Sequence, residues 1–262
     1  MCLAAQCYAS SAPLEGFTYG DLAAPTGNEW EAPEQLAQNK EQPRPTFYSF
    51  QDVDSARKVL PEGSSFWKSL DGQWKFNWVG RPEQRPKDFY KPSFNVSNWD
   101  DIIVPSNWNL LGLKENQKYG TPIYCNQPVI FKHTVAVDDW RGGVMREPPK
   151  DWVTYEDRNE VGSHRRNFTI DSDWDGREVF VKFEGVDSFF YLWINGQKVG
   201  YSQGSYLPAE FNITQYLQPG VNTISTEVYR WSDGSYMECQ DFWRLSGMFR
   251  DVLLYSTESV EL

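Results

Sequence analysis

The fold of this chain is decided by one hairpin sequence, Phe189-Phe-Tyr-Leu-Trp-Ile-Asn-Gly-Gln-Lys-Val-Gly-Tyr201. Asn195 and Gly196 are the two residue types that adopt positive φ most readily, and a two-residue type I′ turn needs positive φ at both central positions. The runs on either side are rich in aromatic and β-branched residues, which favour strands. The sequence therefore predicts a tight antiparallel hairpin centred on Asn195-Gly196.

Further strand patterns lie on both sides of this hairpin. In 74–78 and in 179–183 large apolar residues occupy every second position, so each set shares one face of a strand. Other strand-like runs cover 166–170, 222–231 and 251–255. Many short strands separated by Gly and Pro turns predict an all-β fold, a jelly-roll β-sandwich with an extended N-terminal arm.

The predicted domain organisation is one main domain with an arm before it. Residues 10–45 are rich in Pro, Gln, Glu and Gly and have no sustained apolar period, which indicates that the arm, expected to cover 1–45, lies on a surface. A short helix is expected within 50–58. The sandwich is expected to cover 46–256, and 257–262 to begin a linker.

One long stretch, 138–165, interrupts the strand rhythm. It is heavily charged and contains Gly142-Gly143 and Pro148-Pro149. Since proline cannot donate to a sheet ladder, we expect a long excursion between strands and no central strand here. A functional loop and a solvated insertion are equally compatible with this composition.

Charge and composition exclude several classes of partner. The chain has 25 Lys and Arg against 36 Asp and Glu, and this net charge of −11 repels phosphate backbones and anionic lipids. No apolar run approaches the about 20 residues of a membrane-spanning helix. We therefore expect no nucleic acid and no membrane as partners. The 12 tryptophans suit both a thick β core and stacking on sugar rings.

The cysteines and histidines indicate no structural metal site. The four cysteines form no CxxC pair, and the two histidines, His133 and His164, do not have ligand spacing. Residues 1–11 resemble the end of a secretory signal, although a basic region and most of the apolar region are missing. A periplasmic or secreted location is expected, with the cytoplasm as the alternative.

Residues 200–204 match the G-x-S-x-G nucleophile elbow, which would make Ser202 an esterase nucleophile. That motif needs a following helix and a later histidine. Here Tyr206-Leu-Pro208 follows, and neither histidine lies beyond position 164. We therefore reject the esterase interpretation.

A second segment combines carboxylates, indoles and guanidinium groups: Arg230-Trp-Ser-Asp-Gly-Ser-Tyr-Met-Glu-Cys-Gln-Asp-Phe-Trp-Arg-Leu-Ser-Gly-Met-Phe-Arg-Asp251. Carboxylates accept hydrogen bonds from sugar hydroxyls, and indoles cover the apolar faces of sugars. A buried structural network of ion pairs is the commoner explanation of such a cluster. The composition by itself leaves both interpretations open.

The 230–251 segment closely resembles the signature of the family-two β-galactosidases. Other runs resemble that family in the same order: Leu70-Asp-Gly-Gln-Trp-Lys-Phe76, Val104-Pro-Ser-Asn-Trp-Asn109, Pro122-Ile-Tyr-Cys-Asn126, 183–201 and 207–213. The resemblance covers about 28–255. It implies the amino-terminal sugar-binding domain of a large bacterial glycoside hydrolase, with a galactose-binding-domain-like jelly roll. In that family an immunoglobulin-like domain and a (β/α)8 barrel follow.

The resemblance also implies a site. Position by position, the family's galactose-contacting residues correspond to Asn126 and Asp241, and Asp241 also corresponds to a ligand of a sodium ion in the full-length enzyme. Magnesium occurs elsewhere in the family, and no cofactor is expected in this chain alone. Cys125 and Cys239 are each within two residues of these positions, so we expect them near each other.

The resemblance places the catalytic groups outside this chain. A retaining glycosidase uses two carboxylates about 5 Å apart, and in this family both are barrel glutamates. No catalytic residue is therefore predicted here, and the chain alone is expected to be inactive. The expected partners are the galactoside substrate, the remaining domains of the same polypeptide and a second copy in a homo-oligomer. A stand-alone carbohydrate-binding module and a purely structural bracing or oligomerisation domain are the alternatives.

Overall fold

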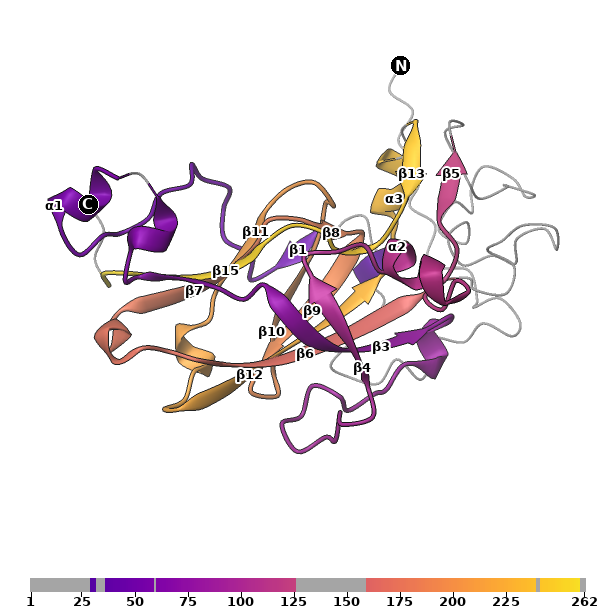
Figure 1. The fold of residues 1–262 in the computed structure, drawn as a ribbon, viewed down its shortest axis with the longest axis horizontal. Helices are drawn as coiled ribbons and strands as arrows, with labels where there is room; N and C mark the ends of the chain where they lie inside the picture. Colours follow the sequence, from indigo (N-terminus) through magenta and orange to yellow (C-terminus); the bar gives the residue numbers. More distant parts are fainter. Residues whose placement is uncertain (1–28, 32–35, 59, 126–158, 239–240, 260–262) are drawn as a thin grey trace, which may run out of the picture.

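Two antiparallel sheets face each other in the computed structural model, which describes residues 29–31, 36–58, 60–125, 159–238 and 241–259 (Figure 1). In sheet order, the seven-stranded sheet contains β1 (Ala37–Gln38), β10 (Gln197–Gln203), β9 (Phe189–Ile194), β12 (Val221–Tyr229), β6 (Val161–Thr169), β3 (Gly72–Val79) and β4 (Asp100–Val104). The four-stranded sheet contains β11 (Ala209–Asn212), β7 (Glu178–Phe183), β15 (Val252–Thr257) and β2 (Trp67–Ser69). The predicted all-β, jelly-roll sandwich is confirmed.

The remaining elements are short. Two short ribbons are formed by β13 (Phe242–Arg244) with β5 (Ile123–Cys125) and by β14 (Gly247–Met248) with β8 (Val186–Asp187). The α-helices are α1 (Val53–Ala56), α2 (Trp108–Gly112) and α3 (Gly234–Met237). Single 3₁₀ turns cover Glu29–Glu31, Pro61–Gly63, Pro82–Gln84, Leu113–Glu115, Ser172–Trp174 and Thr214–Tyr216.

The predicted hairpin is confirmed as β9 and β10. Ile194 pairs with Gln197 across the turn, and Asn195 and Gly196 have φ of 51° and 83°. The Asn195 side-chain amide donates to the Tyr216 carbonyl (2.9 Å), so the turn is also tied to a neighbouring loop. All six residues of β9 are buried, which shows that both faces of this strand are covered.

The two faces of β9 contribute to two hydrophobic cores. Phe190, Leu192 and Ile194 belong to the core between the sheets. The alternate residues Phe189, Tyr191 and Trp193 belong to a second core on the outer face of the seven-stranded sheet.

Trp30, within the predicted 1–45 arm, belongs to this second core. Its side chain is fully buried and stacks on Tyr229 with ring centroids 5.2 Å apart. An isolated tryptophan without periodic apolar neighbours gives no strand or helix signal, so the sequence did not predict this burial.

The expectation that 138–165 contains no central strand is wrong at its end. Val161 to Arg165 begin β6, which pairs with both β12 and β3. Gly162 lets Phe76 and Trp108 pack directly on this strand, since a Cβ at that position would lie 2.6–2.8 Å from their rings. The rest of the stretch lies outside the described residues, apart from 159–160.

Main-chain carbonyls accept hydrogen bonds from the charged side chain of Arg165 in this part of β6. The Arg165 guanidinium donates to the carbonyls of Phe89 (3.3 Å), Pro92 (2.7 Å) and Phe94 (2.8 Å). A buried guanidinium with several acceptors does not interrupt the strand, because its hydrogen bonds replace those to water.

Other local predictions are also confirmed. The helix expected within 50–58 is α1, where the Asp52 side chain caps the N-terminus by accepting a hydrogen bond from the Ser55 N–H (2.7 Å). The runs 74–78, 179–183, 222–231 and 251–255 lie largely in β3, β7, β12 and β15. Ser202 is buried within β10, so the G-x-S-x-G match is not a strand-to-helix elbow.

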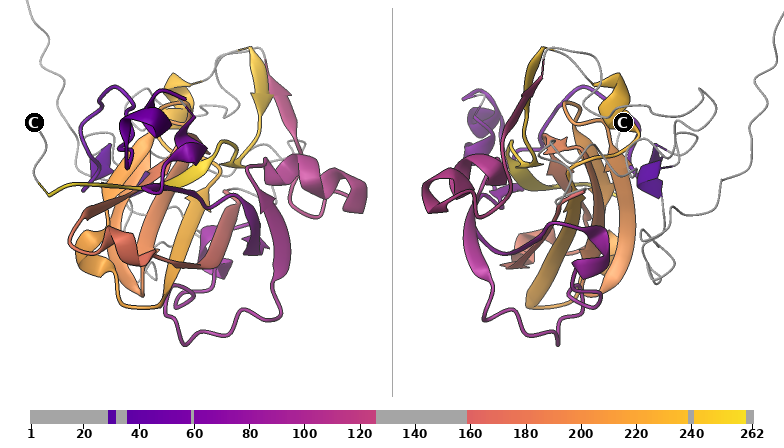
Figure 2. Two further views of the ribbon diagram at one scale, coloured as in Figure 1. Left: turned by 60° about the vertical axis from the view of Figure 1, so that its left-hand side comes forward. Right: turned by 90° about the vertical axis from the view of Figure 1, so that its right-hand side faces the viewer.

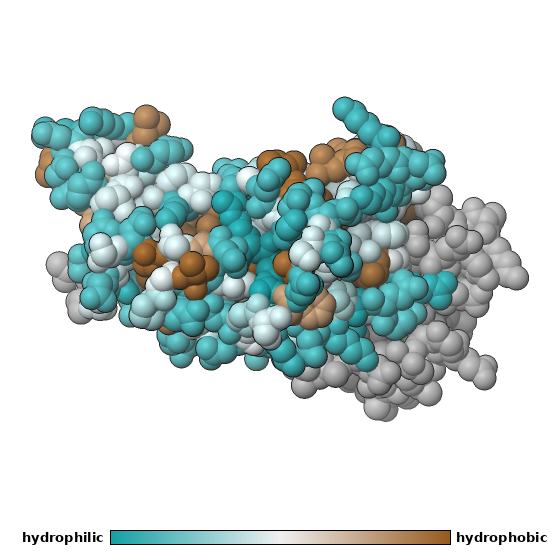
Figure 3. Space-filling view, turned by 60° about the horizontal axis from the view of Figure 1, so that its bottom comes forward, coloured by the Kyte–Doolittle hydropathy of each residue, from teal (hydrophilic) through white to brown (hydrophobic). Residues whose placement is uncertain are grey.

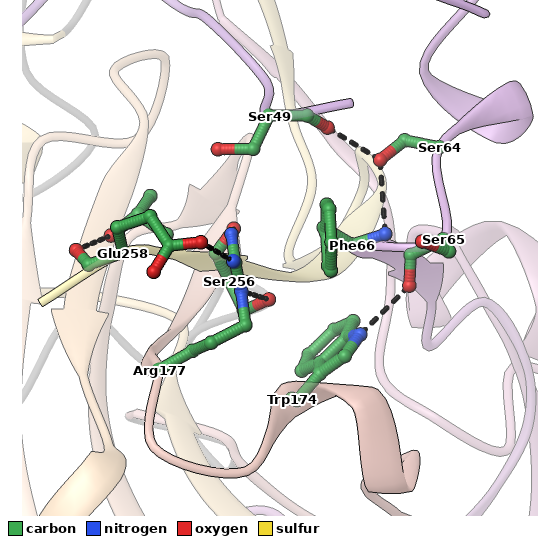
Figure 4. A network of polar contacts seen from close by, with 9 residues as sticks. Ser49, Ser64, Ser65, Phe66, Trp174, Arg177, Ser256 and Glu258 are labelled. Atoms are coloured by element: carbon green, nitrogen blue, oxygen red, sulfur yellow. Dashed lines mark hydrogen bonds and ion pairs between the residues drawn. The ribbon is translucent and has the colours of Figure 1, made fainter. Parts of the chain in front are cut away.

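A polar network ties the end of β15 to neighbouring segments (Figure 4). The Arg177 guanidinium lies 3.8 Å from the centroid of the Phe66 ring, and its Nε donates to the Ser256 hydroxyl (3.0 Å). The Trp174 indole N–H donates to the Ser65 carbonyl (2.8 Å). These contacts hold the start of β2 and the end of β15 together.

The outer surface is mainly hydrophilic on the face shown in Figure 3, where hydrophobic residues form small separate patches. Within the described ranges, no helix combines the length and apolar character needed to cross a membrane.

Candidate functional site

The predicted site residue Asp241 directly precedes β13, which forms with β5 a small ribbon that extends beyond the two sheets (Figure 1, Figure 2). This ribbon, hereafter the β5–β13 ribbon, pairs Tyr124 with Trp243 and Cys125 with Phe242 in antiparallel register. Each strand has only three residues. Because an isolated two-stranded ribbon is marginally stable in water, it needs anchoring by the rest of the domain.

One exposed face of the ribbon carries a carboxylate and two aromatic rings. Tyr124 and Trp243 are 53% and 54% exposed, and their ring centroids lie 5.7 Å apart. The Tyr124 hydroxyl donates to Asp241 Oδ1 at 2.5 Å. Directly opposed residues and residues two positions apart share one face of a strand pair. Asp241, Tyr124 and Trp243 therefore form one continuous surface, the ribbon face.

The base of the ribbon is held by a buried guanidinium. Arg230 Nη2 donates to the carbonyls of Thr121 (2.8 Å) and Arg244 (3.1 Å), which precede β5 and end β13. Arg230 Nη1 forms an ion pair with Glu160, and both side chains are 2% exposed. The planar fork of arginine suits this arrangement, since one group can serve several acceptors at fixed angles.

The segment before Asp241 has a second anchor. Ser205 donates from its backbone N–H to Glu238 Oε1 (2.7 Å) and from its hydroxyl to Oε2 (2.5 Å). Arg244 Nη1 donates to the Glu238 carbonyl (3.1 Å). Residue 238 is thereby fixed to both β13 and the loop after β10.

Asp187, the last residue of β8, lies beside these charges. Burial raises the pKa of its carboxyl to about 8, the charge of Glu238 adds to this effect, and Arg230 and Arg244 oppose it. Burial lowers the pKa of His164 in β6 to about 3. At neutral pH the folded domain therefore holds a neutral Asp187 and a neutral His164.

These two pKa values predict how stability changes with pH. The folded state holds a proton on Asp187 that the unfolded chain releases above its ordinary value of 3.8, so stability falls as pH rises toward 8. His164 acts in the opposite direction, because stability rises with pH between about 3 and its ordinary 6.5. Between pH 6.5 and 8 the effect of Asp187 is therefore not offset by His164.

We expect the free energy of unfolding to fall between pH 6.5 and 8, and Asp187→Asn to remove most of this slope. The slope is at most about 1.4 kcal/mol per pH unit, and it becomes smaller as the pH approaches 8, where the folded state also begins to release the Asp187 proton. Urea unfolding at several pH values measures it. Asp101, whose side chain is 52% exposed, is the matched control, since Asp101→Asn is expected to keep the wild-type slope. Equal slopes in wild type and Asp187→Asn would show that protonation of Asp187 does not cause the pH dependence of stability.

The structure divides the 230–251 segment into two parts. Arg230, Trp231, Asp233 and Arg244 are buried, whereas Asp241 is exposed. The ion-pair interpretation thus holds for Arg230. Asp241 forms no ion pair with any described residue, and its described hydrogen bond comes from Tyr124.

The other predicted positions cannot be placed. Asn126 and Cys239 lie outside the described residues, so the galactose contact of Asn126 and the proximity of Cys125 to Cys239 stay predictions. No group of three or more His, Cys, Asp or Glu side chains in the described ranges could hold a metal ion.

The sequence interpretation did not single out Tyr124, Glu160, Ser205 or Asp187. A signal was present for Tyr124, which precedes Asn126 by two residues and so falls on the same side of an alternating strand. Glu160 is 70 residues from Arg230, and no local pattern connects them.

Solved structures share this fold. A β-glucuronidase from Bacteroides uniformis is 20% identical, with a TM-score of 0.51, over 73% of this chain and 18% of that chain. Identity at this level shows the fold alone.

Curated relatives are closer in sequence. A β-galactosidase of Priestia megaterium is 43% identical over 230 residues, 88% of this chain and 20% of the relative. A β-galactosidase of Halalkalibacterium halodurans is 40% identical over 213 residues, 81% of this chain and 19% of the relative. The chain thus spans about a fifth of the length of these relatives. The family model described as "Glycosyl hydrolases family 2, sugar binding domain" matches residues 67–258. The expected family is confirmed, and the chain belongs to the sugar-binding domains of the family-two glycosyl hydrolases.

Proposed function

We propose that this chain is the sugar-binding domain of a β-galactosidase that hydrolyses terminal β-D-galactosides, and that it contributes Asn126 and Asp241 to the galactose site. The observation that carries this proposal is the exposed Asp241 carboxylate on an anchored ribbon. Cys125 of β5 pairs with Phe242 of β13. Asn126 directly follows Cys125 in the sequence, and Asp241 directly precedes Phe242. That register favours one shared site.

The chemistry of the two side chains suits a hydroxyl-rich ligand. An ionised carboxylate accepts hydrogen bonds at two oxygens, and an amide both donates and accepts. Hydrogen bonds to a charged group contribute about 1.5–3 kcal/mol. The proposed role of this pair is to orient galactose, while the two carboxylates of a retaining mechanism come from another domain of the polypeptide.

Galactosides are proposed as the substrates because the two relatives described above, from Priestia megaterium and Halalkalibacterium halodurans, are named β-galactosidases. Their greater length supports further domains of the same polypeptide as partners. Assembly into a homo-oligomer and a periplasmic or secreted location stay proposals.

A sodium ion at Asp241 is compatible with the donor type, because hard cations bind oxygen ligands. Such a cation needs several oxygen donors, and Asp241 supplies one carboxylate. The described residues alone therefore do not form a sodium site, and its remaining ligands would have to come from elsewhere.

The test compares the full-length polypeptide with the 262-residue chain. We expect the full-length protein to hydrolyse nitrophenyl β-D-galactoside with a much higher kcat/KM than the corresponding β-D-glucuronide. We expect no turnover by the chain alone, since it lacks the paired catalytic glutamates. Chromogenic assays of both proteins on both substrates measure these differences.

Galactose binding by the chain alone separates the alternatives. Because the proposal assigns most of the pocket wall to other domains of the polypeptide, we expect a Kd of about 1 mM or weaker, a binding free energy of about −4 kcal/mol or less favourable. Micromolar binding in an NMR titration would support a stand-alone carbohydrate-binding module. Turnover by the chain alone would contradict the proposal.

A further inference from the structure

Glu238 is held by a single residue through both oxygens of its carboxylate. The Ser205 backbone N–H donates to Oε1 (2.7 Å), and the Ser205 hydroxyl donates to Oε2 (2.5 Å). Ser205 is fully buried, so water does not compete for its two donors. Two hydrogen bonds between one pair of residues fix the orientation of the carboxylate as well as its distance. This pair of residues is hereafter the Ser205–Glu238 clamp.

The loop that carries Ser205 is itself fixed to the sandwich. It directly follows β10, a strand that pairs with both β9 and β1. The Arg250 guanidinium donates to the carbonyl of Tyr206, the next residue after Ser205 (3.1 Å). The Tyr206 ring also packs on Phe249, with ring centroids 5.5 Å apart. Ser205 is therefore a firm attachment point for the segment that contains Glu238.

The Ser205 hydroxyl also forms a hydrogen bond with Asp187. Asp187 holds a proton at neutral pH, as described above, and a protonated carboxyl can donate to the Ser205 oxygen. The hydroxyl proton of Ser205 then stays available for Glu238. The two carboxyl groups thus share one hydroxyl without competing for its proton.

Asp241 lies in a short segment between two fixed points. Glu238 caps the C-terminus of α3 and precedes Asp241 by three residues, and its carbonyl accepts a hydrogen bond from Arg244 (3.1 Å). Phe242, directly after Asp241, pairs with Cys125 of β5. Three residues span at most about 11 Å even when fully extended, which leaves little slack. A displacement of Glu238 therefore displaces Asp241.

We propose that Glu238 and Ser205 are positioning residues of the galactose site, and that the clamp between them determines where the Asp241 carboxylate lies. This inference rests on the proposed function, since it assumes galactose at Asp241. Neither Glu238 nor Ser205 has to contact the sugar. Both act through the backbone of the segment that leads to Asp241.

The experiment uses the full-length polypeptide and nitrophenyl β-D-galactoside. A displacement of about 1 Å in the groups that orient a substrate can lower the rate about 100-fold, so we expect Glu238→Ala to lower kcat/KM at least about tenfold. We expect Glu238→Gln to stay within about threefold of wild type, because its amide can accept from the Ser205 N–H and donate to the Ser205 oxygen. Steady-state kinetics well below the melting temperature of each variant measure both effects.

Glu178→Ala is the matched control for lost hydrogen bonds. Glu178 in β7 also accepts from two donors, Asn212 Nδ2 (2.5 Å) and Thr214 Oγ1 (3.2 Å). β7 and the β5–β13 ribbon lie in separate parts of the sandwich (Figure 1). We expect Glu178→Ala to lower the melting temperature and to leave kcat/KM at the wild-type value. If both alanine variants lose activity in proportion to their stability, general destabilisation is the cause and the inference is overturned.

A double variant tests whether Glu238 acts through Asp241. In the Asp241→Ala background the proposed sugar contact is already absent, so we expect Glu238→Ala to lower kcat/KM by less than about threefold further. Losses that multiply in full overturn the inference, and so does a Glu238→Gln variant as impaired as Glu238→Ala. If Glu238→Ala does not fold, Ser205→Ala takes its place. That variant keeps the N–H donor, and its expected loss is about fivefold.

The failure of this inference differs from the failure of the proposed function. If Asp241→Ala lowers kcat/KM while Glu238→Ala and Ser205→Ala do not, the inference fails and the proposed function stands. If Asp241→Ala keeps wild-type kinetics, or if the wild-type polypeptide hydrolyses no β-galactoside, the proposed function fails and the inference fails with it.

Discussion

Replacement of Arg230 by methionine is expected to lower the free energy of unfolding by about 3–5 kcal/mol, the usual cost of leaving one member of a buried ion pair uncompensated. Arg230 and Glu160 are each 2% exposed, so water cannot solvate the remaining carboxylate. The carbonyls of Thr121 and Arg244 also lose a donor. Chemical denaturation of wild type and Arg230→Met measures the difference.

Two further variants test the cause of this loss. In the double variant Arg230→Met with Glu160→Met both charges are removed, and we expect a large part of the stability to return. Arg57→Met is the exposed control, because the side chains of the Arg57–Asp54 pair are 76% and 89% exposed. That substitution is expected to change stability by less than about 0.5 kcal/mol. Equal destabilisation by the single and double variants would show that lost packing, and not the unpaired charge, is responsible.

Asp241→Asn is expected to lower kcat/KM of the full-length enzyme by about one to two decades, corresponding to about 1.5–3 kcal/mol for a hydrogen bond to a charged group. The substitution removes the charge and nearly preserves the shape, and the new amide oxygen can still accept from the Tyr124 hydroxyl. The effect is therefore expected in binding of galactose and of the transition state. Steady-state kinetics with a chromogenic galactoside measure it.

Stability separates this role from a structural one. Asp241 is exposed and forms no ion pair with a described residue, so we expect the melting temperature to stay near that of wild type. Unchanged activity would remove Asp241 from the site. Activity that falls only in proportion to stability would show that its contribution is structural.

Local sequence was sufficient where the determinants are neighbours in the chain. The Asn195-Gly196 turn, the alternation of Trp74 and Phe76 and the short helix within 50–58 each depend on residues within a few positions of one another, and the sequence predicted all three. The resemblance supplied the family and the position of Asp241, because a motif of many fixed residues identifies a homologous fold without geometry.

The prolines and charged residues of 138–165 led to the wrong prediction for the start of β6. Charged residues usually indicate solvent exposure, but Arg165 donates to three main-chain carbonyls and so remains buried in a central strand. That compensation comes from a loop about 70 residues earlier in the chain, between Phe89 and Phe94. No window of local sequence contains both partners.

The sequence by itself determined the all-β class, the main hairpin, the family and one candidate site residue, Asp241. Only the tertiary structure decided which residues surround Asp241. The Tyr124–Asp241 hydrogen bond joins residues 117 positions apart, and the Arg230–Glu160 ion pair joins residues 70 apart. The physical reason is that hydrogen bonds and ion pairs depend on distance in space, which sheet register sets, whereas turn and strand preferences depend on adjacent residues.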